Sequence, residues 1–184
     1  MNPEVSYLRY SDCFGQSRKN IFLLNIHSLR NKLNLLEADL EVMGRPQIVI
    51  LTETWIEPGS ESFYNINGYR SHHATRLDGY GGVSVFVQDH IRHALLACGS
   101  HVSNEVQLIR LRFFDQDLDL ISFYRKPSER NLFGFRDLLD SVLESTRPIV
   151  LAGDANVDLR KHDAAVTRFF LYLYYLFPPP FEIS

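Results

Sequence analysis

The stretch IFLLNIHSLRNKLNLLEADLEVMGRPQIVILTET, from Ile21 to Thr54, contains the pattern that decides the fold class. It begins with an apolar run of strand length, Ile21–Ile26, and ends with another, Gln47–Thr54. Between them lie apolar residues three or four positions apart: Leu29, Leu33, Leu36, Leu40 and Met43. That spacing is one face of a helix, so the stretch predicts a βαβ-like unit whose strands are neighbours or flank another strand.

The ends of this predicted helix carry their own signals. Ser28 is a suitable N-cap, because its hydroxyl can accept a hydrogen bond from the first helical turn. Gly44 and Pro46 predict the end of the helix, because glycine favours the left-handed position after a helix and proline cannot continue one.

The middle of the chain is rich in residues that favour β-strands. Three runs predict strands: GGVSVFVQ (81–88), EVQLIRLRF (105–113) and LDLISFY (118–124). In the second run, Gln107, Ile109, Leu111 and Phe113 are expected on one face, and Val106, Leu108, Arg110 and Arg112 on the other. Turn signals occur at Asp78-Gly79, Gly81-Gly82 and Asp115 to Asp119.

The last part of the chain predicts two more helices and one strand. LFGFRDLLDSVLES (132–145) has an apolar helical face, PIVLAG (148–153) reads as a strand, and HDAAVTRFFLYLYYLF (162–177) reads as a helix stopped by three prolines. We therefore expect an α/β fold with mixed sheets in one domain, residues 20–184, after a loose polar leader, residues 1–19.

The composition is that of a globular protein. The chain has 184 residues, a net charge of −3 and 45% hydrophobic residues, which argues against binding nucleic acid by bulk charge but allows a local basic groove. Cys13 and Cys98 form no CxxC pair, as expected in a reducing compartment. The N-terminus has no signal-peptide pattern, and the apolar run 169–177 is too short to span a bilayer, so no membrane role is indicated.

Polar side chains follow the apolar runs at the points where strands are expected to end. They are Asn25, Glu53, Tyr124, Asp154 and Asn156. Each has a structural explanation, because Asp and Asn cap helices and initiate turns, and a glutamate at a strand end can simply be solvated. Together they indicate chemistry, since carboxylate and carboxamide oxygens suit Mg²⁺, and a phenol with a carboxylate suits phosphate esters.

Five pieces occur in an order that resembles a known family. They are NIHSLRNKL, ILTETW, GYGGVSVFV, ISFYRKPS and VLAGDANVD. The chain resembles the endonuclease/exonuclease/phosphatase superfamily, and within it the apurinic-endonuclease-like domain of non-LTR retrotransposons. The resemblance covers about residues 20–158 and implies a four-layered α/β sandwich of two mixed sheets flanked by helices.

The resemblance also implies roles for the matching positions. Glu53 is similar to the metal-binding glutamate, with Asn25 beside it in the metal and phosphate site. Tyr124 resembles the tyrosine that contacts the scissile phosphate, Asp154 the aspartate that orients or deprotonates water, and Asn156 the asparagine that hydrogen-bonds phosphate. The implied cofactor is Mg²⁺, with Mn²⁺ as an alternative, and the implied substrate is double-stranded DNA, nicked to leave a 3′-hydroxyl.

Other residues are weaker candidates. Arg125 beside Tyr124 could contact DNA phosphate, with an exposed strand-end arginine as the alternative. Arg76 lies in a segment whose family counterparts are often basic and near DNA. His72 and His73 are adjacent and point in opposite directions on an extended chain, so we expect a solvated loop and poor geometry for a metal that both would share.

The sequence departs from the family pattern after Asn156. The resemblance implies an aspartate near a later strand, often in a segment like S-x-I-D, and a final Ser-Asp-His motif, and neither element occurs in the 28 residues that follow Asn156. His162 follows Arg160 and Lys161, so the role of the motif's histidine is not carried over to it. We expect a truncated or frame-shifted copy, or a fragment, whose sandwich is incomplete and whose activity is reduced.

Three interpretations remain open at the level of sequence. The first is a Mg²⁺-dependent DNA endonuclease that primes reverse transcription, with element RNA reached only through a reverse-transcriptase domain absent from this sequence. The second is an inactive remnant that acts at most as a binding module. The third is a phosphatase of the same superfamily acting on another phosphoester. The first implies a nuclear location and the others an intracellular one, and the sequence leaves the oligomeric state open.

Overall fold

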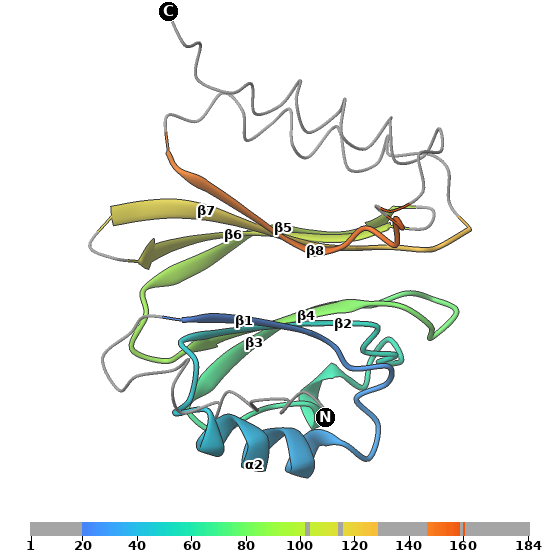
Figure 1. The fold of residues 1–184 in the computed structure, drawn as a ribbon, viewed down its shortest axis with the longest axis horizontal. Helices are drawn as coiled ribbons and strands as arrows, with labels where there is room; N and C mark the ends of the chain where they lie inside the picture. The colour runs from blue at the N-terminus through green and yellow to red at the C-terminus, as the bar shows by residue number, and fades with distance from the viewer. Residues whose placement is uncertain (1–19, 102–103, 114–115, 129–146, 159, 161–184) are drawn as a thin grey trace, which may run out of the picture.

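Two four-stranded sheets face each other in the computed structural model (Figure 1). The structure describes residues 20–101, 104–113, 116–128, 147–158 and 160. The predicted leader and the two predicted helices at 132–145 and 162–177 lie outside the described residues. The predicted α/β sandwich of two mixed sheets is confirmed.

The first sheet has the strand order β1-β2-β4-β3. Its strands are β1 (Ile21–Asn25), β2 (Ile48–Thr52), β3 (Tyr69–Ala74) and β4 (Val83–Gln88). The βαβ-like pattern allowed its two strands to be neighbours or to flank another strand. The structure shows that they are neighbours, since β1 and β2 pair directly and in parallel. β4 pairs antiparallel with both β2 and β3, which makes the sheet mixed.

The second sheet has the order β5-β6-β7-β8. Its strands are β5 (His93–His101), β6 (Asn104–Phe113), β7 (Gln116–Arg125) and β8 (Ile149–Asp154). The first three form an antiparallel meander, and β8 joins β7 in parallel. β8 therefore runs in the same direction as β7, and the polar residues at the ends of these two strands are brought to the same edge.

Helix α2 (Leu33–Val42) packs on the outer face of the first sheet (Figure 1). Its buried side chains Leu36 and Leu40 join a cluster with Val49, Leu51 and Phe86 from the sheet. A short 3₁₀ helix, η1 (Glu61–Phe63), precedes β3. The predicted end of α2 is confirmed, since Met43 is the C-cap and Gly44 has a positive φ of 75°.

The predicted N-cap at Ser28 is wrong, because the helix begins at Leu33 after Lys32. Ser28 has a φ of 76°, and its N–H donates to the Glu53 carbonyl oxygen at 2.7 Å. The N–H of Leu29 likewise donates to the Thr54 carbonyl at 2.8 Å. The backbone after β1 thus stays attached to the end of β2 for several residues instead of turning at once into a helix.

The space between the sheets is filled by apolar side chains from both. The buried cluster includes Ile48, Val85, Ile109, Leu111 and Leu120. The alternation predicted for residues 105–113 is confirmed, because Ile109, Leu111 and Phe113 face this core while Val106 and Leu108 join a cluster on the other face. The sheets therefore form a rigid support for the residues at their edges.

The structure contains two strands that the sequence did not predict, and one strand that begins earlier than predicted. β3 and β5 were not predicted, because YRSHHA and HALLACGSH lack an uninterrupted run of β-forming residues. The turn predicted from Asp115 to Asp119 is too long, since β7 begins at Gln116. Asp119 lies in the strand because its carboxylate binds Arg110 across the pair, at 2.8 and 3.2 Å.

Candidate active site

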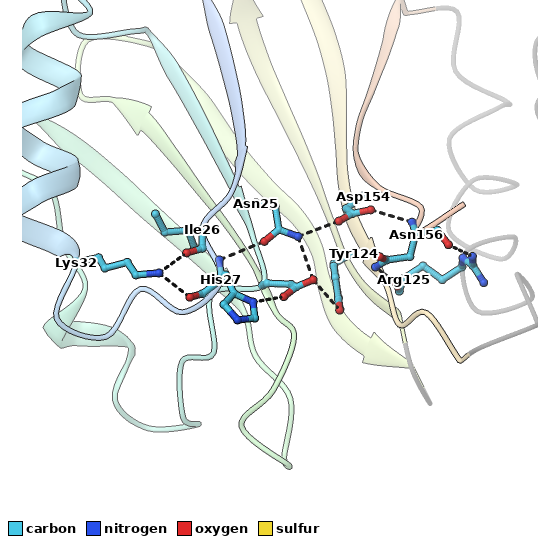
Figure 2. A network of polar contacts seen from close by, with 9 residues as sticks. Asn25, Ile26, His27, Lys32, Tyr124, Arg125, Asp154 and Asn156 are labelled. Carbon is cyan, nitrogen blue, oxygen red and sulfur yellow. Dashed lines mark hydrogen bonds and ion pairs between the residues drawn. The ribbon is translucent and has the colours of Figure 1, made fainter. Parts of the chain in front are cut away.

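Four strand ends converge at one edge of the sandwich, and each supplies a polar side chain (Figure 2). Parallel pairing of β1 with β2 places Asn25 opposite Thr52, one residue before Glu53. Parallel pairing of β7 with β8 places Tyr124 opposite Asp154. The residues predicted from strand ends are thus brought together by the two parallel pairs, one in each sheet.

The side-chain amide of Asn25 links two carboxylates that belong to different sheets. Its Nδ2 atom donates to Oε1 of Glu53 and to Oδ2 of Asp154, each at 3.0 Å. The backbone N–H of His27 donates to Oδ1 of Asn25 at 3.2 Å, which fixes the orientation of the amide. Two carboxylates are therefore held around one amide group, across the gap between the sheets (Figure 2).

Glu53 is ionised in this setting. Partial burial by itself raises the pKa of the Glu53 carboxyl, but hydrogen bonds from Asn25, His27 and Tyr124 outweigh it and hold the pKa below its usual value. The Nδ1 atom of His27 lies 3.1 Å from Oε2 of Glu53, and the His27 side chain is 72% exposed. Sequence reasoning missed His27, although its position two residues beyond Asn25 at a strand end was the available signal.

Tyr124 lies beside Glu53 as a neutral hydrogen-bond donor. Its hydroxyl donates to Oε1 of Glu53 at 3.4 Å. Burial and the nearby carboxylates of Glu53 and Asp154 raise the pKa of the Tyr124 phenol to about 12. The phenol therefore keeps its proton across the physiological range and can stabilise negative charge on oxygen.

The turn after β8 is fixed by reciprocal hydrogen bonds with the end of β7. The N–H of Asn156 donates to Oδ1 of Asp154 at 2.8 Å, and Nδ2 of Asn156 donates to the Arg125 carbonyl at 2.6 Å. The Arg125 guanidinium in turn donates to the carbonyls of Ala155 and Asn156, at 2.5 and 2.9 Å. Arg125 is buried and holds this turn, so it is not the exposed strand-end arginine that the sequence allowed.

Three residues at this edge have an unusual backbone. His27, Glu53 and Asn156 have φ values of 47°, 54° and 48°. Asparagine tolerates this left-handed region, but for other non-glycine residues it costs roughly 1–3 kcal/mol. Such backbone strain concentrates at functional sites, so its presence here supports a functional role for the cluster.

A buried ion pair lies directly behind Tyr124. Glu105 is opposite Tyr124 in the β6–β7 register and is fully buried. Its Oε1 lies 3.3 Å from Nε of Arg76, and its Oε2 accepts the N–H of Gly82 at 3.1 Å. Burial outweighs these contacts and raises the pKa of the Glu105 carboxyl to about 7. The sequence did not indicate a special role for Glu105, because a glutamate at the start of the run EVQLIRLRF is ordinary for the end of a strand.

Arg76 is part of this buried pair and not of an exposed surface. Its side chain is 9% exposed, and Nη2 also lies 2.7 Å from Asp78. Contact between Arg76 and DNA stays a prediction, and so does contact between Arg125 and DNA.

Gly81 explains how Tyr124 and Glu105 can approach each other. A side chain at Gly81 would come within 2.9 Å of Cε1 of Tyr124 and within 3.0 Å of both Arg76 Cδ and Glu105 Oε2. Gly81 also has a φ of 82°. Only glycine meets both requirements without strain, so the Gly81-Gly82 turn shapes the site as well as starting β4.

The donor set fits an open site for a hard divalent cation. Glu53 and Asp154 offer carboxylate oxygens, which Mg²⁺ prefers, and Glu53 is already ionised. Asn25 directs its amide nitrogen at both carboxylates, and its Oδ1 accepts the N–H of His27, so its part here is to position the carboxylates. Within the described ranges, no group of three or more His, Cys, Asp or Glu side chains is arranged to enclose a metal ion. With the carboxylates of Glu53 and Asp154 as its protein ligands, an ion at this position would keep water or substrate oxygens among its other ligands.

An open groove lies beside these residues. Its volume is about 710 Å³, and Trp55, Tyr80, Arg30, Ser28 and Leu77 are among its lining residues. The rings form a short series, with centroids 4.4 Å apart for His27 and Trp55 and 5.4 Å apart for Trp55 and Tyr80. The groove thus combines a half-buried Trp55 ring and an exposed Tyr80 ring with polar groups next to the carboxylates.

Comparisons with known proteins agree with this fold. Residues 20–181 match the sequence profile of the Endonuclease/Exonuclease/phosphatase family. A comparison with curated protein sequences found no match. The endonuclease domain of TRAS1, a telomere-specific non-LTR retrotransposon, is similar in structure, with a TM-score of 0.62 and 20% identity over 85% of this chain and 69% of that one.

Two further solved structures are similar at comparable levels. An AP endonuclease from Archaeoglobus fulgidus has a TM-score of 0.56 and 19% identity, over 85% of this chain and 70% of that one. D. rerio TDP2 complexed with single-strand DNA product has a TM-score of 0.56 and 18% identity, over 80% of this chain and 63% of that one. The aligned parts thus make up 63–70% of the three proteins' own lengths. Among the described helices, none is long and apolar enough to cross a membrane.

Proposed function

The chain belongs to the endonuclease/exonuclease/phosphatase family, and on this premise we propose that it is a Mg²⁺-dependent DNA endonuclease. The observation that carries the proposal is the Asn25 amide, which lies 3.0 Å from the carboxylates of both Glu53 and Asp154. One ionised glutamate and one aspartate, joined beside a neutral tyrosine, can serve separate parts of a phosphodiester hydrolysis.

In this proposal, Asp154 orients the attacking water and accepts its proton. Its Oδ1 is held by the N–H of Asn156 and its Oδ2 by Asn25, so the carboxylate has a fixed direction. Water attacks phosphorus and the bond to the 3′ oxygen breaks, which leaves a 3′-hydroxyl on one side and a 5′-phosphate on the other. A fixed base near the water removes the need for reorganisation during the reaction.

Tyr124 acts on the phosphate itself. The phenol keeps its proton because its pKa is raised to about 12, so it can donate to a non-bridging oxygen as charge develops there. Asn156 helps to position Tyr124, because its side-chain amide donates to the carbonyl of Arg125, the residue after Tyr124, and so ties the turn after β8 to the end of β7. Glu53, with Asn25 beside it, would hold Mg²⁺ or Mn²⁺, and the ion would neutralise charge on phosphate oxygens when bound.

DNA is the substrate that the adjoining groove favours. Trp55 and Tyr80 present aromatic rings on which bases or sugars can stack, while Arg30 in the same groove is paired with Glu57 at 2.7 Å. The similar structures include proteins described as an AP endonuclease, a retrotransposon endonuclease domain and a DNA-product complex. We propose a double-stranded target in the nucleus, as for a retrotransposon endonuclease, with element RNA reached only through a reverse-transcriptase domain.

A plasmid-nicking assay tests this proposal. Purified chain and supercoiled plasmid are incubated with Mg²⁺, and the appearance of open circles is measured for the native chain, Glu53→Gln and Asp154→Asn. We expect nicking by the native chain and by the matched control Glu41→Gln, whose exposed glutamate lies on α2 outside the groove, and none by Glu53→Gln or Asp154→Asn. A folded native chain that nicks no plasmid at any Mg²⁺ concentration contradicts the proposal.

A second candidate function is a binding module without catalysis. It is favoured by the groove beside the cluster, where the Trp55 and Tyr80 rings could bind a nucleic acid without any catalytic step. It predicts that the chain retards a DNA duplex in a gel but never nicks it. The third interpretation, a phosphatase for another phosphoester, predicts release of phosphate from a soluble phosphomonoester with no plasmid nicking.

A further inference from the structure

Two histidines from different sheets meet at the open side of the sandwich, away from the strand-end cluster. His72 lies on β3 and His93 on β5, and each of these strands is the edge strand of its own sheet. Their Nε2 atoms are 3.0 Å apart, and the ring planes are inclined at 82° with centroids 5.1 Å apart. His72 and His73 do point in opposite directions, but they lie in a strand and not in a solvated loop.

The hydrogen-bond partners fix how His93 presents its ring. Its Nδ1 atom lies 2.8 Å from the carbonyl oxygen of Ile91, and a carbonyl can only accept, so Nδ1 carries the hydrogen. In the neutral ring, the Nε2 atom then has a free lone pair that points at His72. A histidine whose second nitrogen donates to a backbone carbonyl is the usual arrangement of a metal ligand.

We propose that His72 and His93 form a two-imidazole binding site for a borderline divalent cation such as Zn²⁺, Cu²⁺ or Ni²⁺, which would join β3 to β5. Imidazole nitrogens suit these ions, whereas Mg²⁺ prefers oxygen. Neither histidine contacts the proposed catalytic residues, so this site does not depend on the proposed endonuclease function.

The distance between the two nitrogens agrees with this chemistry. At metal–nitrogen bonds of about 2.0–2.1 Å, two ligands are about 2.8 Å apart in a square plane and about 3.3 Å apart in a tetrahedron. The observed separation of 3.0 Å lies between these values. An ion bound to both nitrogens would lie off the line that joins them, so both rings would turn to direct their lone pairs at it while their separation stays close to the observed one.

The surroundings predict a site of modest affinity. Both rings are half-buried, so water can reach the ion and complete its coordination. Among the described residues no third His, Cys, Asp or Glu completes a cluster here. Burial, His93 and the charge of Arg70 lower the pKa of His72, which keeps its ring neutral and ready to bind, although the same positive charge opposes a cation.

Calorimetric titration of the full chain with Zn²⁺ tests the site. It is run in a Glu53→Gln background, which removes a carboxylate that could bind the same ion. We expect one equivalent of Zn²⁺ to bind. His72→Gln or His93→Gln should weaken binding by at least roughly 10- to 100-fold, because losing even a residue that only supports a metal ligand costs that much affinity. His90→Gln is the matched control, because His90 is an exposed histidine three residues before His93.

Two further measurements use the chain that retains both histidines, and the first compares it with His93→Gln. Because the ion binds only where both sheets are in place, Zn²⁺ should raise the Tm of this chain and leave the Tm of His93→Gln unchanged. Electron paramagnetic resonance with one equivalent of Cu²⁺ should show two coordinated imidazole nitrogens. Unchanged Zn²⁺ affinity in both variants, or a Cu²⁺ spectrum with a single imidazole, overturns the proposal even if one variant fails to fold.

Discussion

Asn25 and Asp154 are 129 residues apart in the sequence, yet Nδ2 of Asn25 lies 3.0 Å from Oδ2 of Asp154. The contact crosses from the first sheet to the second, since Asn25 ends β1 and Asp154 ends β8. The same amide also binds Glu53. The geometry of the proposed site therefore depends on how the two sheets are stacked, and four expected outcomes follow from it.

Replacing Asn25 with leucine should remove the hydrogen bonds that hold the carboxylates of Glu53 and Asp154 together. Leu is similar in size but donates no hydrogen bond, so both 3.0 Å contacts are lost. The nicking rate should fall by about 10²–10³-fold, as when one donor is removed from a charge-stabilising site. The pKa of Glu53 should rise, because Asn25 is one of the donors that lower it, and carboxyl-carbon NMR titration can follow it.

Asn67→Leu provides the control for this substitution, since Asn67 is an exposed asparagine outside the cluster. It should change neither quantity. Equal nicking rates for Asn25→Leu and Asn67→Leu would remove Asn25 from the proposed mechanism.

Tyr124 should remain protonated at every pH at which the protein is normally studied. Burial, Glu53 and Asp154 all raise its pKa, to about 12. In a spectrophotometric titration of tyrosinate, the native chain minus Tyr124→Phe should show no difference below about pH 11. The nicking rate of Tyr124→Phe should fall about 10²-fold, in line with losing one preorganised donor. A difference signal with a midpoint near the ordinary pKa of 10.0 would contradict the assigned environment.

Glu105 should make the native chain less stable as the pH rises. Its pKa is raised from 4.5 in the unfolded chain to about 7 in the folded one, so the folded state binds the proton more tightly. The associated stability is fully present below pH 4.5 and is lost as the pH rises through about 7. The loss is on the order of 3 kcal/mol in the free energy of unfolding.

Urea unfolding of Glu105→Gln between pH 4 and 8 measures this effect. Glutamine keeps the shape but does not titrate, so we expect a flatter dependence on pH than in the native chain. Glu57→Gln serves as the control, because Glu57 is exposed and its loss should leave the native pH dependence in place. Parallel curves for the native chain and Glu105→Gln would show that Glu105 is not the titrating group.

Gly81→Ala and Gly59→Ala form a matched pair that separates backbone strain from packing. Both glycines have a left-handed backbone, with φ of 82° and 89°, and an alanine in that region costs roughly 1–2 kcal/mol. A methyl group at Gly59 meets nothing within 4 Å, whereas at Gly81 it meets Tyr124 at 2.9 Å. Gly81→Ala should therefore destabilise the chain more than Gly59→Ala, by chemical denaturation, and should also lower the nicking rate. Equal losses would mean that the Tyr124 contact yields without cost.

The sequence predicted most of the elements that carry the site, for local reasons. Asn25, Glu53 and Asp154 stand out because each follows an apolar run of strand length, and a polar group at the end of such a run marks the edge of a sheet. Tyr124 stands out for the same reason at the end of β7. The start of α2 was wrong because Ser28 looks like an N-cap, while its backbone N–H is already bound to Glu53 of the neighbouring strand, which no local pattern reveals.

The residues that sequence reasoning missed act through partners far away in the chain. His27 is notable only because it reaches Glu53, Glu105 only because it is buried against Arg76 and behind Tyr124, and His93 only because it meets His72. In each case the residue type is common, and only its contact in the folded chain indicates a role. Cysteine spacing and charge gave no comparable signal.

The sequence by itself determined the α/β class, six of the eight described strands and the polar residues at the strand ends, because periodicity and strand length are local properties of the chain. The stacking of the two sheets decided the rest. It places Asn25 between Glu53 and Asp154, buries Arg76 against Glu105 and brings His72 to His93. These contacts join residues that are far apart in the sequence, and no local pattern indicates that they meet. Only the packing of one sheet on the other specifies them.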